Sequence, residues 1–361
     1  MTATPLFNRA GMLWQQRISG MHEYEFVREG NVFSAGFSQS FVFSSEYEAA
    51  RQLLATLLSQ YQGRNFDSVF CGRDEVNSGG VCFAHTSRHD LSFHPFDTGR
   101  FRDEVEKDLS LVHGIGPATG KKLNARGYLT LNDLCRHPHY CHNAKDVLTR
   151  ISGGNTLEIM NLIGGRHSRS HRSVLGTAAM HEPEDFVFFD IETLGLFGRP
   201  IILFGIGSVE NEKLCVTQYL LRDIDEEEAA LLATVSHLSG DHPALVTFNG
   251  KSFDLPYLTD RLAYYGLGSP VAIPHFDMLH FSRRRWKGEL SSLRLTALEK
   301  AVLEIKRKDD IPGQMVPEFY EAYQRSGNCG PLVPILDHNR QDVVSLARLF
   351  FHLMGESYGC T

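Results

Sequence analysis

Carboxylate side chains follow apolar runs at several points in the second half of the chain. Asp190 and Glu192 directly extend an apolar run at 186–189 that is typical of a buried strand. Because alternate side chains of a strand project from the same face, these two carboxylates are brought together. They repel each other unless a cation lies between them, and rigid oxygen ligands suit Mg²⁺ or Mn²⁺. The pattern therefore indicates a divalent-metal site.

Two other segments offer acidic residues of the same kind. Asp254 follows an apolar run at 244–248, where open α/β sheets place their ligands. Asp342 lies in a segment with helical apolar spacing at 335–351, and His338 precedes it by four residues. Residues four apart share one face of a helix, so this imidazole can orient or deprotonate an attacking water, or can be structural only.

The elements that must position these side chains follow from the same periodicities. Residues 186–193 predict a strand, and residues 200–209 predict an antiparallel neighbour after a glycine turn. Helical spacing begins near Asp254, after the strand predicted at 244–248. Asp277 is expected at a strand end, where it can support the site without belonging to the metal set. These elements together predict an α/β domain.

The composition is that of a globular protein with two or three domains. The chain has 361 residues, of which 42% are hydrophobic and 22% charged, so a single small module, a fibrous chain and a disordered chain are excluded. Its apolar runs are shorter than a membrane-spanning helix requires, and its N-terminus lacks a secretory pattern. Seven scattered cysteines favour reduced thiols. We therefore expect a cytoplasmic protein with no membrane partner.

The charge is unevenly distributed along the chain. The net charge of −7 argues against a nucleic-acid partner, but residues 110–172 hold nine Lys and Arg against three acidic residues. Within them, Gly114 and Gly116 separate two helical stretches, and Lys121 and Lys122 follow one turn later. A glycine turn that leads into a helix N-terminus suits a phosphate group. This segment is therefore a candidate contact for a nucleic-acid backbone.

The same segment resembles the helix-hairpin-helix family. The family pattern is Gly-Ile-Gly between two helices, then a small residue and a leucine, and these places are filled by residues 114–116, Gly120 and Leu123. Gly120 stands where the family usually has alanine. The resemblance implies contact with a DNA backbone regardless of base sequence, and a purely structural αα-hairpin is the alternative.

The carboxylate pattern resembles the DEDD exonucleases of the ribonuclease-H-like superfamily. That family has D-x-E on its first strand, N-x-x-x-F-D after a later strand and an Asp on its final helix, as found here from Asp190, from Asn249 and at Asp342. The similarity spans about residues 185–353 and comes closest to the YprB-like bacterial group. The characteristic residues of that group recur at 298–299, 310–313, 316–317, 320 and 338–346.

The resemblance implies hydrolysis of phosphodiester bonds at a 3′ end with two Mg²⁺ or Mn²⁺ ions. It implies Asn249 as a nucleic-acid contact and His338 as a catalytic residue. One departure concerns His338, since the best-known branches have Tyr four residues, or His five residues, before the last Asp. The implied metal-binding and catalytic carboxylates are Asp190, Glu192, Asp254 and Asp342.

Two further segments carry positive charge. Arg283 and Arg284 begin a basic run that includes Trp286, a combination suited to phosphate binding and base stacking in a single-strand channel. A solvated face around one buried Trp is the alternative. Residues 166–173 have no apolar residue and predict an exposed linker.

We therefore predict a ribonuclease-H-like mixed sheet flanked by helices at 183–361. A small all-α helix-hairpin-helix segment with its linker precedes it at 102–172, and an α+β region of unknown role occupies 1–101. In that N-terminal region we expect strands near 23–27 and 38–43 and a helix at 45–61.

The predicted function is that of a two-metal 3′ to 5′ exonuclease. We expect it to act on single-stranded nucleic acid or 3′ ends, with DNA favoured over RNA because of the hairpin motif. The alternatives are a structure-selective endonuclease on the same fold and a DNA-binding adaptor with a silent nuclease domain.

Overall fold

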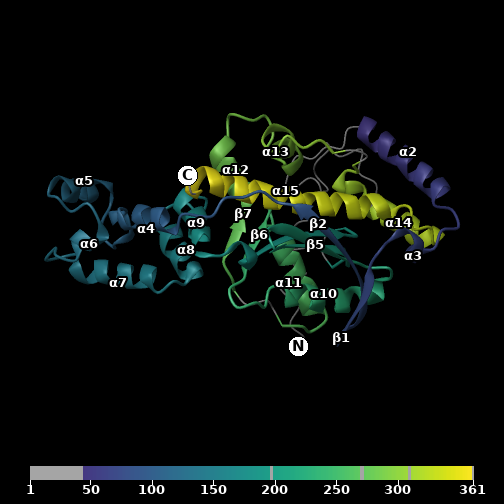
Figure 1. Ribbon diagram of the computed structural model, residues 1–361, viewed down its shortest axis with the longest axis horizontal. Coiled ribbons are helices and arrows are strands. Elements are labelled where there is room, and N and C mark those ends of the chain that lie inside the picture. Colours follow the sequence, from purple (N-terminus) through teal and green to yellow (C-terminus); the bar gives the residue numbers. More distant parts are fainter. Residues whose placement is uncertain (1–43, 196–197, 269–271, 308–309, 360–361) are drawn as a thin grey trace, which may run out of the picture.

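The computed structural model describes residues 44–195, 198–268, 272–307 and 310–359. At its centre is one mixed sheet of seven strands in the order β1-β2-β5-β4-β3-β6-β7 (Figure 1). The β3–β6 and β6–β7 pairs are parallel, and the other neighbours are antiparallel. The strands are β1 (Arg73–Asn77), β2 (Gly80–Asp90), β3 (Phe186–Thr193), β4 (Ile201–Glu210), β5 (Lys213–Leu220), β6 (Ala244–Thr247) and β7 (His275–Asp277).

Helices cover both faces of this sheet. The long α15 crosses one face, and α10 and α11 pack against the other (Figure 1). Short 3₁₀ turns, η3 (Pro183–Asp185), η4 (Ile224–Glu226) and η5 (Gly313–Met315), connect the elements. The helices of this domain are α2 (Ser44–Gln60), α3 (Phe66–Val69), α10 (Glu227–Ser236), α11 (Asp254–Tyr264), α12 (Met278–Trp286), α13 (Leu295–Ala301), α14 (Val316–Ser326) and α15 (Leu332–Tyr358).

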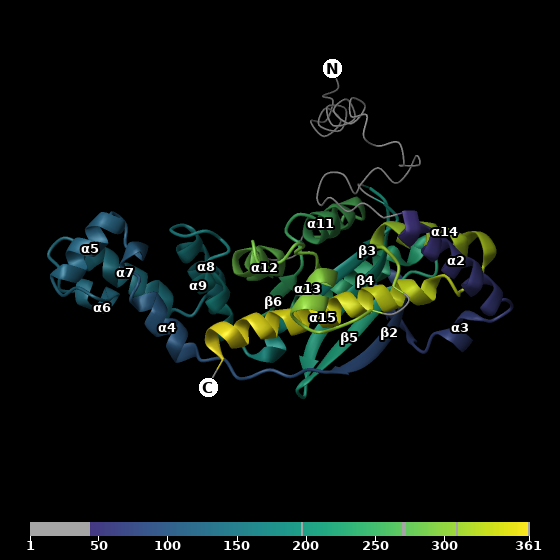
Figure 2. The same cartoon turned by 90° about the horizontal axis from the view of Figure 1, so that it is seen from above.

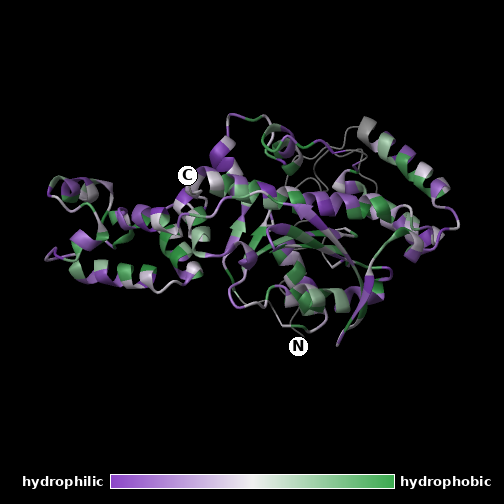
Figure 3. Ribbon diagram, in the orientation of Figure 1, coloured by the Kyte–Doolittle hydropathy of each residue, from purple (hydrophilic) through white to green (hydrophobic). Residues whose placement is uncertain are grey.

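The alternation of side chains along β3 separates the two hydrophobic layers. Phe186 and Phe188 pack in the layer that contains α15, and the Phe186 ring lies 4.6 Å from that of Phe350. Val187 and Phe189 pack in the opposite layer with α10 and α11. By the same alternation, Asp190 and Glu192 are on the α15 side of the sheet. Figure 3 shows hydrophobic residues concentrated in the central strands and alternating with hydrophilic ones along α2.

The first two strands extend the central sheet. The hairpin of β1 and β2 turns at 77–80 and joins the sheet through antiparallel pairing of β2 with β5. The sequence prediction placed residues 1–101 in a region of their own, whereas these strands share a sheet with β3. The helix predicted at 45–61 is observed as α2. The strands predicted near 23–27 and 38–43 lie outside the described residues.

A lobe of short helices extends from one end of the sheet domain (Figure 2). The first helix of the lobe, α4, ends at Glu106, and Asp108 caps the following turn η1 (Leu109–Leu111). Thr130 caps α6 in a capping box with Asp133. The lobe comprises α4 (Thr98–Glu106), α5 (Pro117–Ala125), α6 (Leu131–Leu134), α7 (Cys141–Ser152), α8 (Thr156–Gly164), α9 (Arg172–Gly176) and the turn η2 (Thr177–Met180).

The lobe and the sheet domain share one hydrophobic core. Phe101 of α4 packs edge-on against Tyr358 at the end of α15, and both side chains are fully buried. The same cluster continues through Ile115 of the hairpin turn to Phe186 of β3. Within the part of the chain that the structure describes, no helix combines the length and the apolar character that crossing a bilayer demands.

Candidate active site

Asp190 is held in place by a chain of buried amides. Asn339 of α15 donates from Nδ2 to Asp190 Oδ2 at 2.9 Å, and Gln218 of β5 donates to Asn339 Oδ1 at 2.8 Å. Both amide residues are fully buried. A Cβ atom at Gly205 in β4 would lie 2.3 Å from Asn339 Oδ1, so glycine is required there for α15 to approach the sheet. The strand, its neighbours and the helix thus fix one Asp190 rotamer together.

Glu192 and Asp342 both lie near one ring nitrogen of His338, and Asp310 lies at the other. The imidazole Nε2 is 3.7 Å from Glu192 Oε1 and 3.6 Å from Asp342 Oδ2, and Nδ1 is 2.7 Å from Asp310 Oδ1. The spacing of four residues along α15 therefore turns His338 and Asp342 to the same face. The His338 side chain is only 11% exposed.

Asp254 reaches the same cluster from the start of α11. Its Oδ1 accepts a hydrogen bond from the backbone N–H of Ile191, at 3.2 Å, between the two acidic residues of β3. The preceding turn is held by Asp277, whose carboxylate accepts from the N–H groups of Asn249 at 2.8 Å and Lys251 at 3.1 Å. Asp277 is 1% exposed and also caps α12. It thus supports the site through this turn.

Arg307 binds several acidic residues at the edge of the cluster. Its guanidinium donates two hydrogen bonds of 2.7 Å to Glu299 and one of 3.1 Å to Asp310. It also forms an ion pair with Asp342 and lies 3.4 Å from His338 Nδ1. Glu299 is 1% exposed, so this arginine compensates a buried charge as well as part of the cluster.

The environment of the carboxylates raises their pKa values. Burial raises the pKa of Asp190 well above its ordinary value, and the three neighbouring carboxylates add to the rise. Burial raises the pKa of Glu192 to about 8, against the lowering effect of His338. Burial raises the pKa of Asp254 to about 7, although backbone N–H groups lower it. Burial alone lowers the pKa of His338, but the surrounding carboxylates raise it to about 10. The imidazole is therefore cationic at neutral pH in this arrangement.

The donor set suits a divalent cation in its chemistry but is partly occupied by cationic side chains. Across residues 44–359, apart from the short stretches the structure leaves undescribed, no three His, Cys, Asp or Glu side chains stand ready to hold a metal ion. Cationic side chains contact two of the four carboxylates: Arg307 binds Asp342, and His338 faces Glu192. Four gathered carboxylates nevertheless offer the oxygen donors that Mg²⁺ and Mn²⁺ prefer. The residues fit such a cation once Arg307 leaves Asp342.

The predicted nucleic-acid contacts are divided between the two parts of the molecule. Asn249 lies in the turn before Asp254, with a positive φ of 69°. Arg283 and Arg284 are exposed on α12, whereas Trp286 is buried. In the lobe, Gly114 has a φ of 86° and Gly116 caps α5, which carries the exposed Lys121 and Lys122. The structure thus gathers the predicted catalytic residues but places the lobe residues apart from them.

Three residues that the sequence analysis did not assign hold the cluster together. Gln218 is a polar residue in the apolar β5, and that contrast was the available signal. Asn339 stands beside His338 in the sequence string noted above, but its buried amide role follows only from the packing against Gly205. Arg307 lies in an irregular segment between α13 and η5, where no periodicity points to it.

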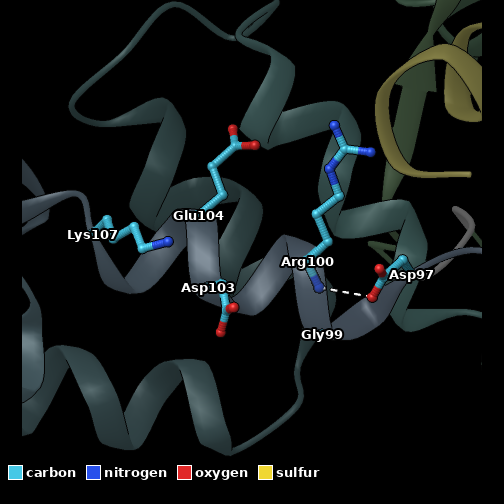
Figure 4. Close-up of a pocket in the computed structure, with 6 residues that line it drawn as sticks. All are labelled: Asp97, Gly99, Arg100, Asp103, Glu104 and Lys107. Atoms are coloured by element: carbon cyan, nitrogen blue, oxygen red, sulfur yellow. Dashed lines mark hydrogen bonds between the residues drawn. The ribbon is translucent and has the colours of Figure 1, made fainter. Parts of the chain in front are cut away.

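An open hollow of about 550 Å³ lies elsewhere, along α4 in the helical lobe. Its lining is polar and comes from one turn and one helix, with Arg100 N donating to Asp97 Oδ1 (Figure 4). It contains none of the predicted catalytic residues. We therefore place the candidate active site at the carboxylate cluster and not at this hollow.

Comparison with known proteins finds a matching family model and curated relatives. Residues 187–354 match the family model of the RNase_H superfamily. The chain is 35% identical over 182 residues to the uncharacterized protein YprB of Bacillus subtilis, which covers 49% of this chain and 44% of YprB. It is 31% identical over 123 residues to a DNA polymerase III PolC-type of Ureaplasma parvum, which covers 27% of this chain and 8% of that protein.

The family match falls on the part of the chain that holds the carboxylates of β3, α11 and α15. The chain spans less than half the length of the curated relatives it matches. It carries a ribonuclease-H-like superfamily domain and is homologous to YprB. The predicted mixed α/β fold is confirmed.

Proposed function

We propose that this protein is a metal-dependent 3′ to 5′ exonuclease that acts on single-stranded DNA or on DNA 3′ ends. One observation carries the proposal: β3, α11 and α15 bring four carboxylates to one place, where burial and neighbouring carboxylates raise the pKa values of Asp190, Glu192 and Asp254. Clustered buried charge destabilises a fold unless a counter-charge compensates it. A site built this way is suited to divalent cations.

The four carboxylates Asp190, Glu192, Asp254 and Asp342 would hold Mg²⁺ or Mn²⁺, in our view as two ions. Bound there, such ions supply a nucleophile at neutral pH and stabilise the leaving oxygen of a phosphodiester. The chain's own residues prepare the site. Asn339 fixes the Asp190 rotamer, and Asp277 fixes the turn that ends at Asp254.

His338 is proposed to hold the attacking water. Its Nε2 faces Glu192 and Asp342, so a water at this edge is within reach of the imidazole. Only a neutral imidazole accepts a proton, and the carboxylates now keep His338 cationic. Cations that neutralise those carboxylates would lower its pKa toward the range in which it works as a base.

Two considerations favour DNA and a 3′ end. The helix-hairpin-helix resemblance of residues 114–123 implies a DNA backbone, and one relative is named a DNA polymerase. The cleavage direction follows from the DEDD resemblance of the carboxylate pattern. A structure-selective endonuclease and a binding adaptor with a silent site remain the competing functions.

A degradation assay with end-labelled strands distinguishes these functions. Linear and circular single-stranded DNA, together with RNA of the same sequence, are incubated with the wild type in Mg²⁺, in Mn²⁺ and in EDTA. We expect linear DNA to shorten from its 3′ end, RNA to shorten more slowly, and circular DNA to resist. Cleavage of the circle would indicate an endonuclease, and binding without cleavage of any strand would indicate an adaptor.

The Asp190→Ala variant tests whether the carboxylate cluster is responsible for hydrolysis. We expect hydrolysis to fall by about 10³-fold or more while strand binding persists, since this residue would ligand metal and not substrate. Asp337→Ala is the matched control, because Asp337 also contributes a carboxylate but is exposed on α15 and pairs with Arg340. Activity of Asp190→Ala equal to that of Asp337→Ala would overturn the site assignment.

A further inference from the structure

The segment between α8 and α9 is exposed at Arg166, Ser168 and Arg169, as its sequence predicts, but it also makes specific side-chain contacts. Arg166 Nη2 lies 3.3 Å from Nδ1 of His113, which immediately precedes the glycine turn of the hairpin. His167 stacks on His171 with ring centroids 4.4 Å apart and forms a 2.5 Å contact with Asp108. The segment is therefore packed onto the lobe in one conformation.

The same segment also contacts the sheet domain. Arg284 of α12 donates from Nη1 to Ser168 Oγ at 3.3 Å. Figure 2 shows α12 beside α8 and α9 at this junction. Burial lowers the pKa of the Lys251 ammonium; the Asp277 carboxylate raises it, and Arg169 is close enough to add to the lowering. Lys251 stands three residues before Asp254, in the turn held by Asp277.

These contacts place four cations between the hairpin and the turn before Asp254, and we call this set the basic track: Arg166, Arg169, Arg284 and Lys251. All four are exposed. Among the described residues none of the four forms an ion pair, whereas the nearby acids are taken, Asp108 by His167 and Glu104 by Arg172. Unpaired exposed cations leave their charge available to an external anion.

We propose that the basic track binds the phosphates of a single strand of DNA and leads it from the hairpin to the carboxylate cluster. This inference rests on the proposed function, because it takes the cluster as the place of reaction. One end of the track meets the turn before Gly114, and the other end is the turn before Asp254. Regularly spaced phosphates are the ligands that such a set of arginine and lysine side chains fits.

The burial of the cluster favours a single strand over a duplex. Glu192 is 9% exposed and Asp254 is 4% exposed, so a scissile phosphate must come close to nearly buried oxygens. The end of one flexible strand reaches them more easily than a phosphate within a rigid duplex. A long strand would also bind hairpin and cluster together, and the second contact is then intramolecular and strengthens binding.

Binding measured against strand length tests the track. Fluorescence anisotropy in EDTA compares labelled single strands of about 5 and about 30 nucleotides, because the short strand cannot reach every site at once. The test variant is Arg166→Ala/Arg169→Ala/Arg284→Ala. The matched control is Arg73→Ala/Arg88→Ala/Arg325→Ala, which removes the same charge from arginines that are 68% to 76% exposed in the sheet domain.

We expect the track variant to bind the long strand at least tenfold more weakly than the wild type. Its plot of log affinity against log salt should be flatter by about 2, given about 0.7 for each phosphate of a single strand that the protein no longer binds. The control should stay within about twofold of the wild type. Arg166 and Arg284 contact other side chains, so their loss could also affect folding. Arg169→Glu is therefore a second variant, because Arg169 is exposed and forms no hydrogen bond among the described residues.

Equal affinity of the track and control variants for the long strand would overturn the track. An equal loss of affinity for the short and the long strand would also overturn it. The arginines would then make one local contact with DNA and would not form a path along the strand. The proposed function is tested separately by hydrolysis of the short strand by the wild type in Mn²⁺. Failure of that reaction leaves the binding result intact, so the two failures are distinguishable.

Discussion

The sheet domain and the helical lobe differ in where their charged side chains lie: the sheet domain buries a cluster of carboxylates, and the lobe exposes lysines. In the sheet domain, four carboxylates from three distant segments are packed close together, and burial raises the pKa values of Asp190, Glu192 and Asp254. In the lobe, Lys121 and Lys122 stand exposed on α5. Buried like charges cost free energy of folding, whereas exposed cations cost little. The difference is what we expect if, as we propose, the cluster performs the chemical step and the lobe binds the strand reversibly.

After Asp190, the largest effect expected from a single substitution is at His338, at the centre of the cluster. His338→Ala should lower the rate constant of hydrolysis by about 10²- to 10⁴-fold at saturating substrate and metal, which is the range for a general base. The control is His352→Ala on the same helix, where the imidazole stacks on Trp286 outside the cluster. The turnover of the two variants is measured under the same conditions. A His338→Ala variant that keeps nearly the wild-type turnover, as His352→Ala should, would contradict the role of His338.

A readout beyond rate separates catalysis from structure at this position. His338→Tyr places a hydroxyl at the spacing used by the Tyr-bearing branch of the superfamily. We expect partial activity with a weaker dependence on acid pH, because the phenol does not titrate near neutrality. An inactive His338→Tyr variant with a lowered unfolding midpoint would indicate that the histidine is structural.

The next prediction concerns the stability of the fold and Arg307, the cation that pairs with the acidic residues at the edge of the cluster. Arg307→Ala leaves the buried Glu299 without its bidentate partner, and we expect the free energy of unfolding to fall by about 3 to 5 kcal/mol. Chemical denaturation with urea measures this loss. Arg325→Ala, which removes an exposed i,i+4 pair with Glu321, should cost about 1 kcal/mol or less. Equal losses would show that Arg307 does not compensate buried charge.

Much of the site follows from local rules of the sequence. The period of two in β3 placed Asp190 and Glu192 on one face, and the spacing of four in α15 placed His338 beside Asp342. Helical spacing also predicted the start of α11 at Asp254. These side chains lie as expected because their arrangement depends on neighbours within one element, which the sequence displays directly.

The features that were missed depend on partners far apart in the chain. The pairing of β2 with β5 joins residues more than 120 positions apart, so no local pattern assigned β1 and β2 to the central sheet. Arg307 reaches Asp342 from a segment without periodicity. The predicted linker is exposed at Arg166, Ser168 and Arg169 as expected, but its contact with Arg284 of the sheet domain was not predicted. Tertiary contacts of this kind are not encoded in spacing alone.

The smallest effect is expected in the lobe. Lys121→Glu/Lys122→Glu should weaken binding of all strand sequences alike by about tenfold, with a salt dependence flatter by about 0.7 to 0.9 for each phosphate that the lobe no longer binds. Lys213→Glu/Lys300→Glu, on exposed lysines of the sheet domain, makes the same change of charge elsewhere. If both double variants bind alike across a salt titration, the hairpin has only a structural role.

Calorimetric titration with Mn²⁺ at pH 6 and pH 8 tests most directly whether the carboxylate cluster is a metal site. Because the pKa values of Glu192 and Asp254 are raised to about 8 and about 7, protons compete with the metal at pH 6 and far less at pH 8. We predict that the wild type binds Mn²⁺ at least tenfold more tightly at pH 8, with release of protons, that Asp190→Asn loses this binding, and that Asp337→Asn retains it. Equal Mn²⁺ affinity of the wild type and Asp190→Asn at both pH values would contradict the account.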